Sequence, residues 1–527
     1  MKKKEFHWIL VYAFVLVLLT TMPYFLGYMV ENEEWRFTGF IIGVEDGNSY
    51  IAKMLLGSAG SWLFKSPYSS MEQNGVIAFL PYILLGKLAS GPGIHEQLVV
   101  LYHLFRIFVT PLAIYATYQF ISLFIKEVPW RRLATILSTA GGGLGWLFVI
   151  VGKGEWHGSL PMDWISPEWF GFLAIFGTPH LILARALLLL GLTLYLTSPI
   201  KKERAWLAGG SFILLGLVHP LGMATAIAVV SVHQCAIGIT AYSRKSSLIW
   251  KKWLKLGLKA ILTPLPLIVY YFIRFSTDPY LILWTKQNRI FSPNPIHIFI
   301  AYGLVLIPAI LSVKRILDFR RWTGLAILAW LLAFPIFAYS PHNLQRRLPD
   351  GIWVVWTILA ILGLDLISKR WLKKPQLLGT IFVALCLPTS FVLLISAIRY
   401  SVLRSSPIFR KGEEVEVFEW LRVEAAPKSI VLSSFATGNA LPAWAPVIVV
   451  LGHGPETADH ISVEADVSAF YGGRMNDQEM IEFIQDYRIS YIFWGPLERV
   501  PDGIDLASSP LFELRFEIGD FQLYEVQ

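Results

Sequence analysis

The sequence has few charged residues and almost no cysteine. Asp, Glu, Lys and Arg make up only 16% of its 527 residues, whereas hydrophobic residues make up 55% and the mean hydropathy is +0.55. This excludes an ordinary soluble protein, in which about 25% of residues are charged. Cys235 and Cys386 both lie in apolar runs, so neither a disulfide nor a cysteine metal site is implied. The composition predicts a multi-pass membrane protein built as a helical bundle.

The first apolar run has no charged residue from Trp8 to Tyr28. It is longer than the core of a secretory signal peptide, which spans about 7–15 residues. The following stretch, MVENEEWR, has no small-residue cleavage site. We therefore expect a retained transmembrane anchor.

Ten further apolar runs are long enough to be spans, which gives eleven in all. They are residues 103–125, 133–151, 179–198, 204–218, 221–241, 257–273, 296–313, 322–339, 351–368 and 376–398. With a cytoplasmic N-terminus, alternate connections hold the basic clusters, as the positive-inside rule requires. These clusters are at residues 126–132, 201–204, 244–255, 314–321 and 369–374. The net charge of +8 is thus explained by topology, and we do not expect nucleic-acid binding.

An odd number of spans predicts that residues 404–527 lie outside the cytoplasm, as a soluble domain after a transmembrane domain of residues 1–403. In the soluble part, SIVLSS and SYIFWGP have the pattern of buried strands. EVEVFEWLR and DQEMIEFIQDY have helical spacing, so we expect an α/β domain. The segments GNALPAW and GHGPETA are predicted to be loops.

The long first outer loop, residues 29–100, contains the stretch VEDGNSYIAKM with two adjacent acids, Glu45 and Asp46. One interpretation is that Asp46 caps a helix, for which aspartate is a preferred residue. The other is that Asp46 is a general base for an acceptor hydroxyl, with Glu45 as a helper or a metal ligand. Residues 76–89 are too short to span a bilayer and suit a helix in the membrane interface.

Other outer loops hold basic and aromatic residues. Arg346 and Arg347, in the sequence QRR, depart from the positive-inside pattern, and arginine suits a phosphate group. The second outer loop is rich in tryptophan, at Trp156, Trp164 and Trp169. These rings can anchor the loop at the interface or stack on a sugar.

Some polar residues fall within or between apolar runs. His180 and Arg185 are expensive in lipid and are expected to face the bundle interior, either in structural pairs or against substrate. Arg106, nearer the end of its run, is explained by snorkelling to the interface. His219, before Pro220, marks a tight outer turn, with a functional role as the alternative.

With these features the chain resembles the C-type membrane glycosyltransferases (GT-C), which move a sugar from a polyprenyl-phosphate carrier to an acceptor. The resemblance rests on VEDGNSY, the helix after it, the many spans, the outer QRR and the C-terminal domain. It implies an essential acid in the first outer loop, at Asp46 first and Glu45 second. The Trp-Trp-Asp-Tyr-Gly run of the oligosaccharyltransferase branch and any Asp-x-Asp triplet are missing. Oligosaccharide transfer is therefore not indicated.

The predicted function is sugar transfer, inverting and of a hexose or pentose, from a polyprenyl phosphate on the extracytoplasmic face. Asp46 and Glu45 form the predicted catalytic pair. The predicted substrate-binding residues are Tyr50, Lys53, His180, Arg185, Gln345, Arg346 and Arg347. No organic cofactor is expected, and a divalent metal is left open without a motif for its ligands. The alternatives are a transporter or flippase of lipid-linked sugars and a non-catalytic membrane scaffold.

Overall fold

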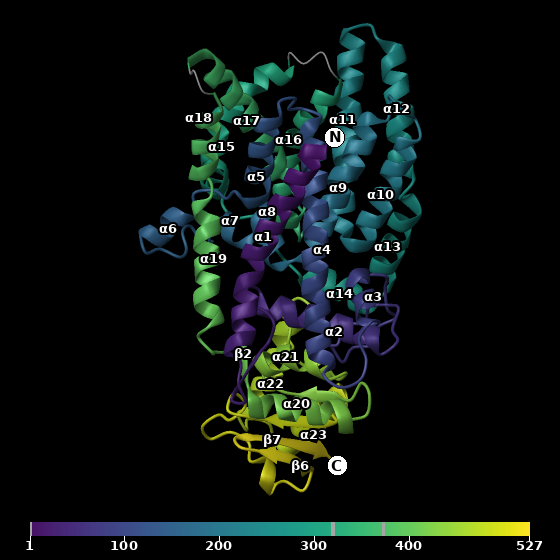
Figure 1. Cartoon of the computed structure of the whole chain (residues 1–527). Helices are drawn as coiled ribbons and strands as arrows, with labels where there is room; N and C mark the ends of the chain where they lie inside the picture. Colours follow the sequence, from purple (N-terminus) through teal and green to yellow (C-terminus); the bar gives the residue numbers. More distant parts are fainter. Residues whose placement is uncertain (1–2, 318–321, 372–374) are drawn as a thin grey trace. The chain divides into compact units, whose positions relative to one another are not determined.

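The chain packs into two compact units, each built from separate stretches of sequence (Figure 1). The computed structural model describes residues 3–317, 322–371 and 375–527. Unit 1 comprises residues 1–21, 105–271 and 289–396, and unit 2 comprises residues 22–104, 272–288 and 397–527. The first outer loop thus packs with the C-terminal segment, whereas the predicted domains divide the chain at residue 403.

Long apolar helices confirm a multi-pass membrane protein. Within the described ranges, six helices are long and apolar enough to cross a membrane. They are α1 Lys3–Val30, α4 Ile94–Ser122, α9 Pro179–Thr197, α11 Pro220–Ser243, α15 Ile296–Leu317 and α17 Ile352–Trp371. Two bent pairs bring the number to eight. They are α12 Ser247–Leu262 with α13 Leu265–Thr277, bent by 43°, and α18 Pro375–Leu385 with α19 Pro388–Ser401, bent by 42°.

The other predicted spans correspond to shorter helices, so the count of eleven stays a prediction. Two of these are α10 Arg204–Val218 and α16 Leu325–Ala338. The predicted span 133–151 is wrong as a single helix, because α5 Val128–Ala140 ends at three glycines and only the short α6 Trp146–Ile150 follows. At Gly143 a Cβ would lie 2.2 Å from the Ala301 carbonyl oxygen, so the glycine allows close backbone packing. Small elements complete unit 1: α7 Met162–Ile165, α8 Gly171–Gly177, η1 Trp322–Gly324 and η2 Gln345–Arg347.

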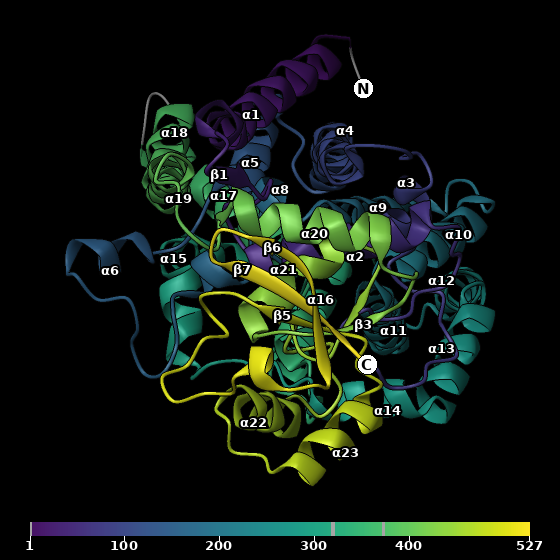
Figure 2. The same cartoon turned by 90° about the horizontal axis from the view of Figure 1, so that it is seen from below.

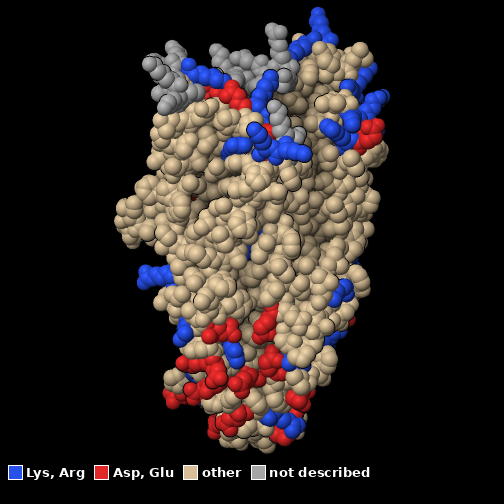
Figure 3. Space-filling view, viewed as in Figure 1, with Lys and Arg blue, Asp and Glu red and all other residues tan. Residues whose placement is uncertain are grey.

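Charge on unit 1 gathers at one end. In Figure 3, Lys and Arg collect where α11 meets α12, and a belt without charge covers the helices below. The exposed basic residues of this connection are Arg244, Lys245, Lys251, Lys252 and Lys255. Such a belt suits hydrocarbon, while the orientation of the termini stays a prediction. Parts of the predicted basic clusters, at residues 318–321 and 372–374, lie outside the described residues.

Unit 2 contains a mixed sheet with helices on both faces, which confirms small α/β structure near the C-terminus. The strand order is β4-β3-β5-β7-β6, with β3 parallel to β4 and β5, and β7 antiparallel to its neighbours. The strands are β3 Ile430–Leu432, β4 Ile448–Val449, β5 Tyr491–Trp494, β6 Phe512–Ile518 and β7 Phe521–Val526. Figure 2 shows α20 Gly412–Glu424 on one side and α22 His460–Tyr471 with α23 Asp477–Tyr487 on the other. A 3-10 turn, η3 Leu506–Ser508, precedes β6.

The rest of unit 2 joins the first outer loop to the C-terminal segment. β1 Trp35–Phe37 pairs antiparallel with β2 Phe409–Lys411, and α2 Val44–Ser58 packs against α21 Phe435–Trp444. The segment GNALPAW is therefore wrong as a loop, because it lies within α21. Ser434, the residue before α21, accepts a hydrogen bond from the Thr437 amide and caps the helix. The remaining helix of unit 2 is α14 Pro279–Gln287, which follows α13 in the sequence.

The predicted interfacial helix is also shorter than expected. Only α3 Leu80–Gly86 is helical, and it packs against α2. A Cβ at Gly86 would lie 1.8 Å from the Met54 carbonyl oxygen, and one at Gly57 would lie 2.0 Å from the Ile83 carbonyl oxygen. Glycine at both positions lets the two helices touch backbone to backbone. This contact fixes α2, the helix that carries the predicted acids.

Candidate active site

Asp46 lies in the first turn of α2 and does not cap it. The helix begins at Val44 after Gly43, which has a left-handed backbone with φ of 60°, and no side-chain cap bond is made. The capping interpretation is therefore wrong. The Asp46 side chain is 53% exposed, so its carboxylate faces solvent beside the positive end of the helix dipole. Glu45 is exposed next to it.

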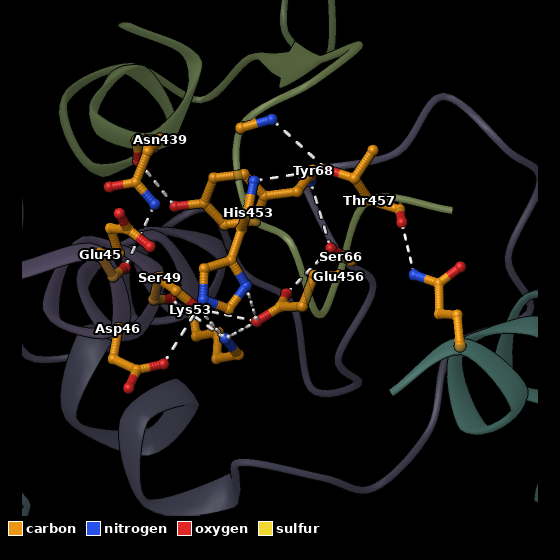
Figure 4. A network of polar contacts seen from close by, with 12 residues as sticks. Glu45, Asp46, Ser49, Lys53, Ser66, Tyr68, Asn439, His453, Glu456 and Thr457 are labelled. Atoms are coloured by element: carbon orange, nitrogen blue, oxygen red, sulfur yellow. Dashed lines mark hydrogen bonds and ion pairs between the residues drawn. The ribbon is translucent and has the colours of Figure 1, made fainter. Parts of the chain in front are cut away.

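His453 lies directly behind Asp46, on the loop of residues 452–457 (Figure 4). Its Nε2 is 3.4 Å from Asp46 Oδ1, and its Nδ1 is 3.4 Å from Glu456 Oε1. Only 5% of the His453 side chain is exposed. An imidazole thus separates an exposed carboxylate from a buried one.

Lys53 and Glu456 form a buried ion pair at the far end of this chain of contacts. Lys53 Nζ is 2.6 Å from Glu456 Oε1, and it also donates to the Ser49 hydroxyl. Ser49 and Ser66 donate to the two Glu456 oxygens at 2.7 and 2.9 Å. Burial raises the pKa of Glu456, but Lys53, His453 and the Ser49 hydroxyl outweigh it and hold the pKa below its usual range. The ammonium of Lys53, predicted to bind substrate, is occupied by Glu456.

Hydrogen bonds from several segments fix α2 and the loop of residues 452–457. The Asn48 amide donates to Asn439 Oδ1 at 2.8 Å, and Asn439 donates to the Glu45 carbonyl oxygen at 3.3 Å. From α14, the Tyr280 hydroxyl donates to the Glu456 carbonyl oxygen at 2.8 Å. The Asp46–His453–Glu456–Lys53 network therefore has a rigid frame.

Tyr50, also predicted to bind substrate, lies one turn after Asp46 on α2. Its ring stacks on Tyr82 with centroids 4.7 Å apart, and Tyr82 stacks on Tyr102 at 5.8 Å. Tyr82 and Tyr102 are buried, whereas Tyr50 keeps partial exposure. The helix therefore presents an aromatic side chain beside the exposed acid.

In unit 1, the predicted arginines lie in η2 and are held by Glu168 and Trp169, which lie between α7 and α8. Arg347 Nε is 3.5 Å from Glu168 Oε1, and 37% of the Arg347 side chain is exposed. The Trp169 indole nitrogen donates to the Arg346 carbonyl oxygen at 2.8 Å. Trp169 is buried, so neither the interfacial nor the sugar-stacking interpretation holds for it. Gln345, half-buried, begins the same turn.

His180 and Arg185 face the interior of unit 1, as predicted, and both are buried. Arg185 Nη2 is 2.9 Å from Asp350 Oδ1 and also donates to the Glu168 carbonyl oxygen at 2.6 Å. His219, which separates α10 from α11 as predicted, lies 3.9 Å from Asp350. This supports a structural pair for Arg185.

Arg106 corrects the snorkelling interpretation. Its side chain is fully buried and donates to Thr20 at 3.0 Å and to Thr21 at 2.8 Å. Hydroxyl groups of α1 thus satisfy this guanidinium inside the protein.

No metal site is preformed in the part of the chain that the structure describes. Among those residues, no three His, Cys, Asp or Glu side chains are grouped as ligands. The possible role of Glu45 as a metal ligand thus has no further ligands to support it, and we derive no step through a metal.

The partners of the predicted residues have little signal in the sequence. His453 and Glu456 lie three positions apart in GHGPETA, and Glu168 and Asp350 lie in connections between helices. The available signal was a histidine and a glutamate in a Gly- and Pro-rich loop outside the spans. Nothing in the sequence alone pairs that loop with residues 44–54.

Comparison with solved structures identifies the fold. The apo form of the Archaeoglobus fulgidus oligosaccharyltransferase matches with a TM-score of 0.55 and 12% identity, over 92% of this chain and 69% of that protein. Its complex with an inhibitory peptide and a dolichol-phosphate matches with a TM-score of 0.53 and 13% identity, over 93% and 70%. The chain has the GT-C fold. The form tethered to an acceptor peptide with the NVT sequon gives a TM-score of 0.53 and 13% identity, over 92% and 69%.

The GT-C fold confirms the resemblance seen in the sequence. No family model matches the chain, and no curated protein sequence is similar to it. At 12–13% identity the structural likeness concerns the fold, so the chemistry must be argued from the residues of this chain.

Proposed function

We propose that the protein is a membrane glycosyltransferase that moves a sugar from a polyprenyl-phosphate carrier to an acceptor on the extracytoplasmic face. One observation carries the proposal: an exposed carboxylate, Asp46, is held by a buried His–Glu–Lys chain in a GT-C fold. A structure without catalytic use for Asp46 has little reason to brace a surface carboxylate with buried charges, which are costly to desolvate.

Asp46 would act as the general base. Its carboxylate removes the proton of an acceptor hydroxyl, and the acceptor oxygen attacks the sugar carbon as the carrier phosphate leaves. A single displacement of this kind inverts the sugar centre, so we propose an inverting transfer. Glu45, also exposed, would help to hold the acceptor through its charge.

The arginines of η2 would bind the carrier phosphate. Guanidinium groups match phosphate oxygens with two parallel, charge-assisted hydrogen bonds. Arg347 keeps 37% of its side chain exposed while Glu168 orients it. The dolichol-phosphate bound by the archaeal protein of the same fold supports a polyprenyl phosphate as the carrier class.

The test is transfer by the purified full-length protein with a panel of polyprenyl-phosphate sugars and of lipid, glycan and peptide acceptors. Asp46→Asn should cut turnover by about 10²–10⁴-fold without changing the melting temperature, because the amide keeps the shape but cannot accept a proton. Asp486→Asn, an exposed aspartate on α23, is the matched control and should keep full turnover.

Two outcomes would contradict the proposal. One is equal transfer by wild type and Asp46→Asn. The other is movement of intact lipid-linked sugar across reconstituted vesicles without any transfer, which is the behaviour of a flippase.

A further inference from the structure

We propose that His453 is a positioning residue that acts through Asp46 and receives the proton that Asp46 takes from the acceptor. The inference rests on the proposed function, since it gives a path for the proton of that reaction. It assigns the loop of residues 452–457 to the active site, although sequence places this loop in the C-terminal segment and about 400 positions from α2.

The contacts have the order that such a path needs. Asp46 is exposed, His453 lies behind it at 3.4 Å, and Glu456 lies 3.4 Å behind the other ring nitrogen. Solvent reaches Asp46 but hardly reaches His453, of which 5% is exposed. The exposed Asp46 carboxylate therefore offers a proton on the imidazole a way back to water.

The charge on Glu456 selects one tautomer of His453. Lys53 Nζ, at 2.6 Å, and two serine hydroxyls hold Glu456 ionised. Burial raises the pKa of Glu456, but the charge of Lys53 outweighs burial, so the pKa lies below the usual range. A buried carboxylate attracts the ring hydrogen to Nδ1, the nitrogen on its side. The lone pair of Nε2 then faces Asp46, where a proton arrives.

The groups around the imidazole are few. Asp46 and Lys53 come from α2, and Glu456 comes from the loop that carries His453. Tyr68 comes from the segment before α3, and its ring centroid lies 5.4 Å from that of His453. One carboxylate thus lies on each side of the ring, and Lys53 is paired with Glu456.

The proton of the acceptor hydroxyl moves in two steps. The acceptor O–H bond breaks and the proton bonds to Asp46, while the acceptor oxygen bonds to the sugar carbon and the carrier phosphate leaves with its electron pair. The proton then passes from Asp46 to Nε2 of His453, which restores the carboxylate and leaves an imidazolium between two carboxylates. An imidazole is a stronger base than a carboxylate by about 2–3 pKa units, so it retains the proton better.

The experiment compares pH profiles of transfer for wild type, His453→Gln and His460→Gln, all as full-length protein. A glutamine at position 453 keeps a hydrogen-bonding group near Asp46 but cannot take up a proton. His460→Gln is the matched control, because His460 pairs with Glu464 at 3.8 Å near the surface. We expect wild-type turnover to fall on acidification, because an imidazole that already carries two ring protons cannot take up another.

In His453→Gln, the fall in turnover on acidification (the acid limb of the profile) should disappear, and turnover at pH 7.5 should be at least tenfold lower than in wild type. His460→Gln should keep the acid limb and the wild-type turnover. A normal rate and limb in His453→Gln would overturn the proposal, because a purely structural role predicts rescue by glutamine. If His453→Gln does not fold, the wild-type profile decides, and a profile without an acid limb overturns the proposal.

A second readout separates this inference from the proposed function. Nitrogen NMR of histidine-labelled protein at pH 8, with His453 assigned by comparison with Asp46→Asn, reports the tautomer without any transfer. Hydrogen on Nδ1 supports the proposal, and hydrogen on Nε2 overturns it. Absence of transfer by wild type with any donor instead contradicts the proposed function, whatever the tautomer.

Discussion

In unit 2, Lys53 is buried against Glu456, and in unit 1, Arg185 is buried against Asp350. Each pair lies behind a predicted site residue of its own unit, and those two residues have opposite charge. Behind Asp46 the path runs through His453, so unit 2 presents an anion. In unit 1, the Glu168 carbonyl oxygen accepts a hydrogen bond from Arg185, and the Glu168 carboxylate pairs with Arg347. The exposed residue of unit 1 is therefore the cation Arg347.

In both units the buried pair and the exposed residue have different roles. A buried pair gains little net stability, because desolvation offsets the attraction, yet removal of one partner leaves an uncompensated charge. Each pair therefore acts as a rigid support whose loss is expensive. The chemistry depends on the residue that the support holds at the surface.

The largest expected effect comes from breaking one support. Lys53→Met should destabilise the protein by about 3–5 kcal/mol, because Glu456 is left buried without its cation. The double variant Lys53→Met, Glu456→Gln should recover part of the loss, since it removes both charges. Denaturant unfolding of the purified protein measures both, and equal stability of the single and double variants would contradict the supporting role.

Changing the exposed cation should have a smaller and different effect. Arg347→Ala should weaken binding of a polyprenyl-phosphate sugar by about tenfold or more, the range of one hydrogen bond to a charged group. Arg347→Lys should fall between wild type and alanine, because lysine lacks the planar fork. Direct binding of the donor decides the matter. Affinities like wild type in both variants would remove the phosphate role.

The smallest effect concerns pH, where the two supports differ. The pKa of Glu456 is lowered, so its contribution to stability is present above the ordinary value of about 4.3 and is lost as pH falls through the folded value. The pKa of Asp350 is raised by burial in spite of Arg185, so protonation there does not cost stability. Acidification toward pH 3 should therefore loosen residues 452–457 before residues 345–352.

Hydrogen exchange followed by mass spectrometry resolves these two segments. Equal protection of both at pH 3, relative to pH 7, would remove the proposed difference between the pairs.

Much of the fold could be predicted from apolar length and periodicity. The runs that became α1, α9 and α17 are continuous, and the strands β3 and β5 have buried, β-branched or aromatic sequences. The failures have local causes. α5 ends at Ala140, because the glycines that follow, Gly141 to Gly143, pack closely against neighbouring segments instead of continuing the helix. α21 forms in spite of Pro442, because α2 packs against it.

The site could be predicted only in part. Asp46, Arg346 and Arg347 have visible signals, an acid or a basic pair in an outer loop. Their partners do not, because the pairing of Asp46 with His453 and of Arg185 with Asp350 depends on tertiary contacts between distant segments. Composition and periodicity carry no information about such contacts.

The pairing of α2 with the C-terminal segment also has a consequence for biosynthesis. Ser49 and Glu456, which are hydrogen-bonded, are 407 positions apart. At about 5–20 residues per second, the ribosome needs about 20–80 s to make the second after the first. During that time Lys53 has no carboxylate partner and Asp46 has no imidazole behind it. We therefore expect α2 of the nascent chain to be exposed to chaperones until the loop of residues 452–457 has been synthesised.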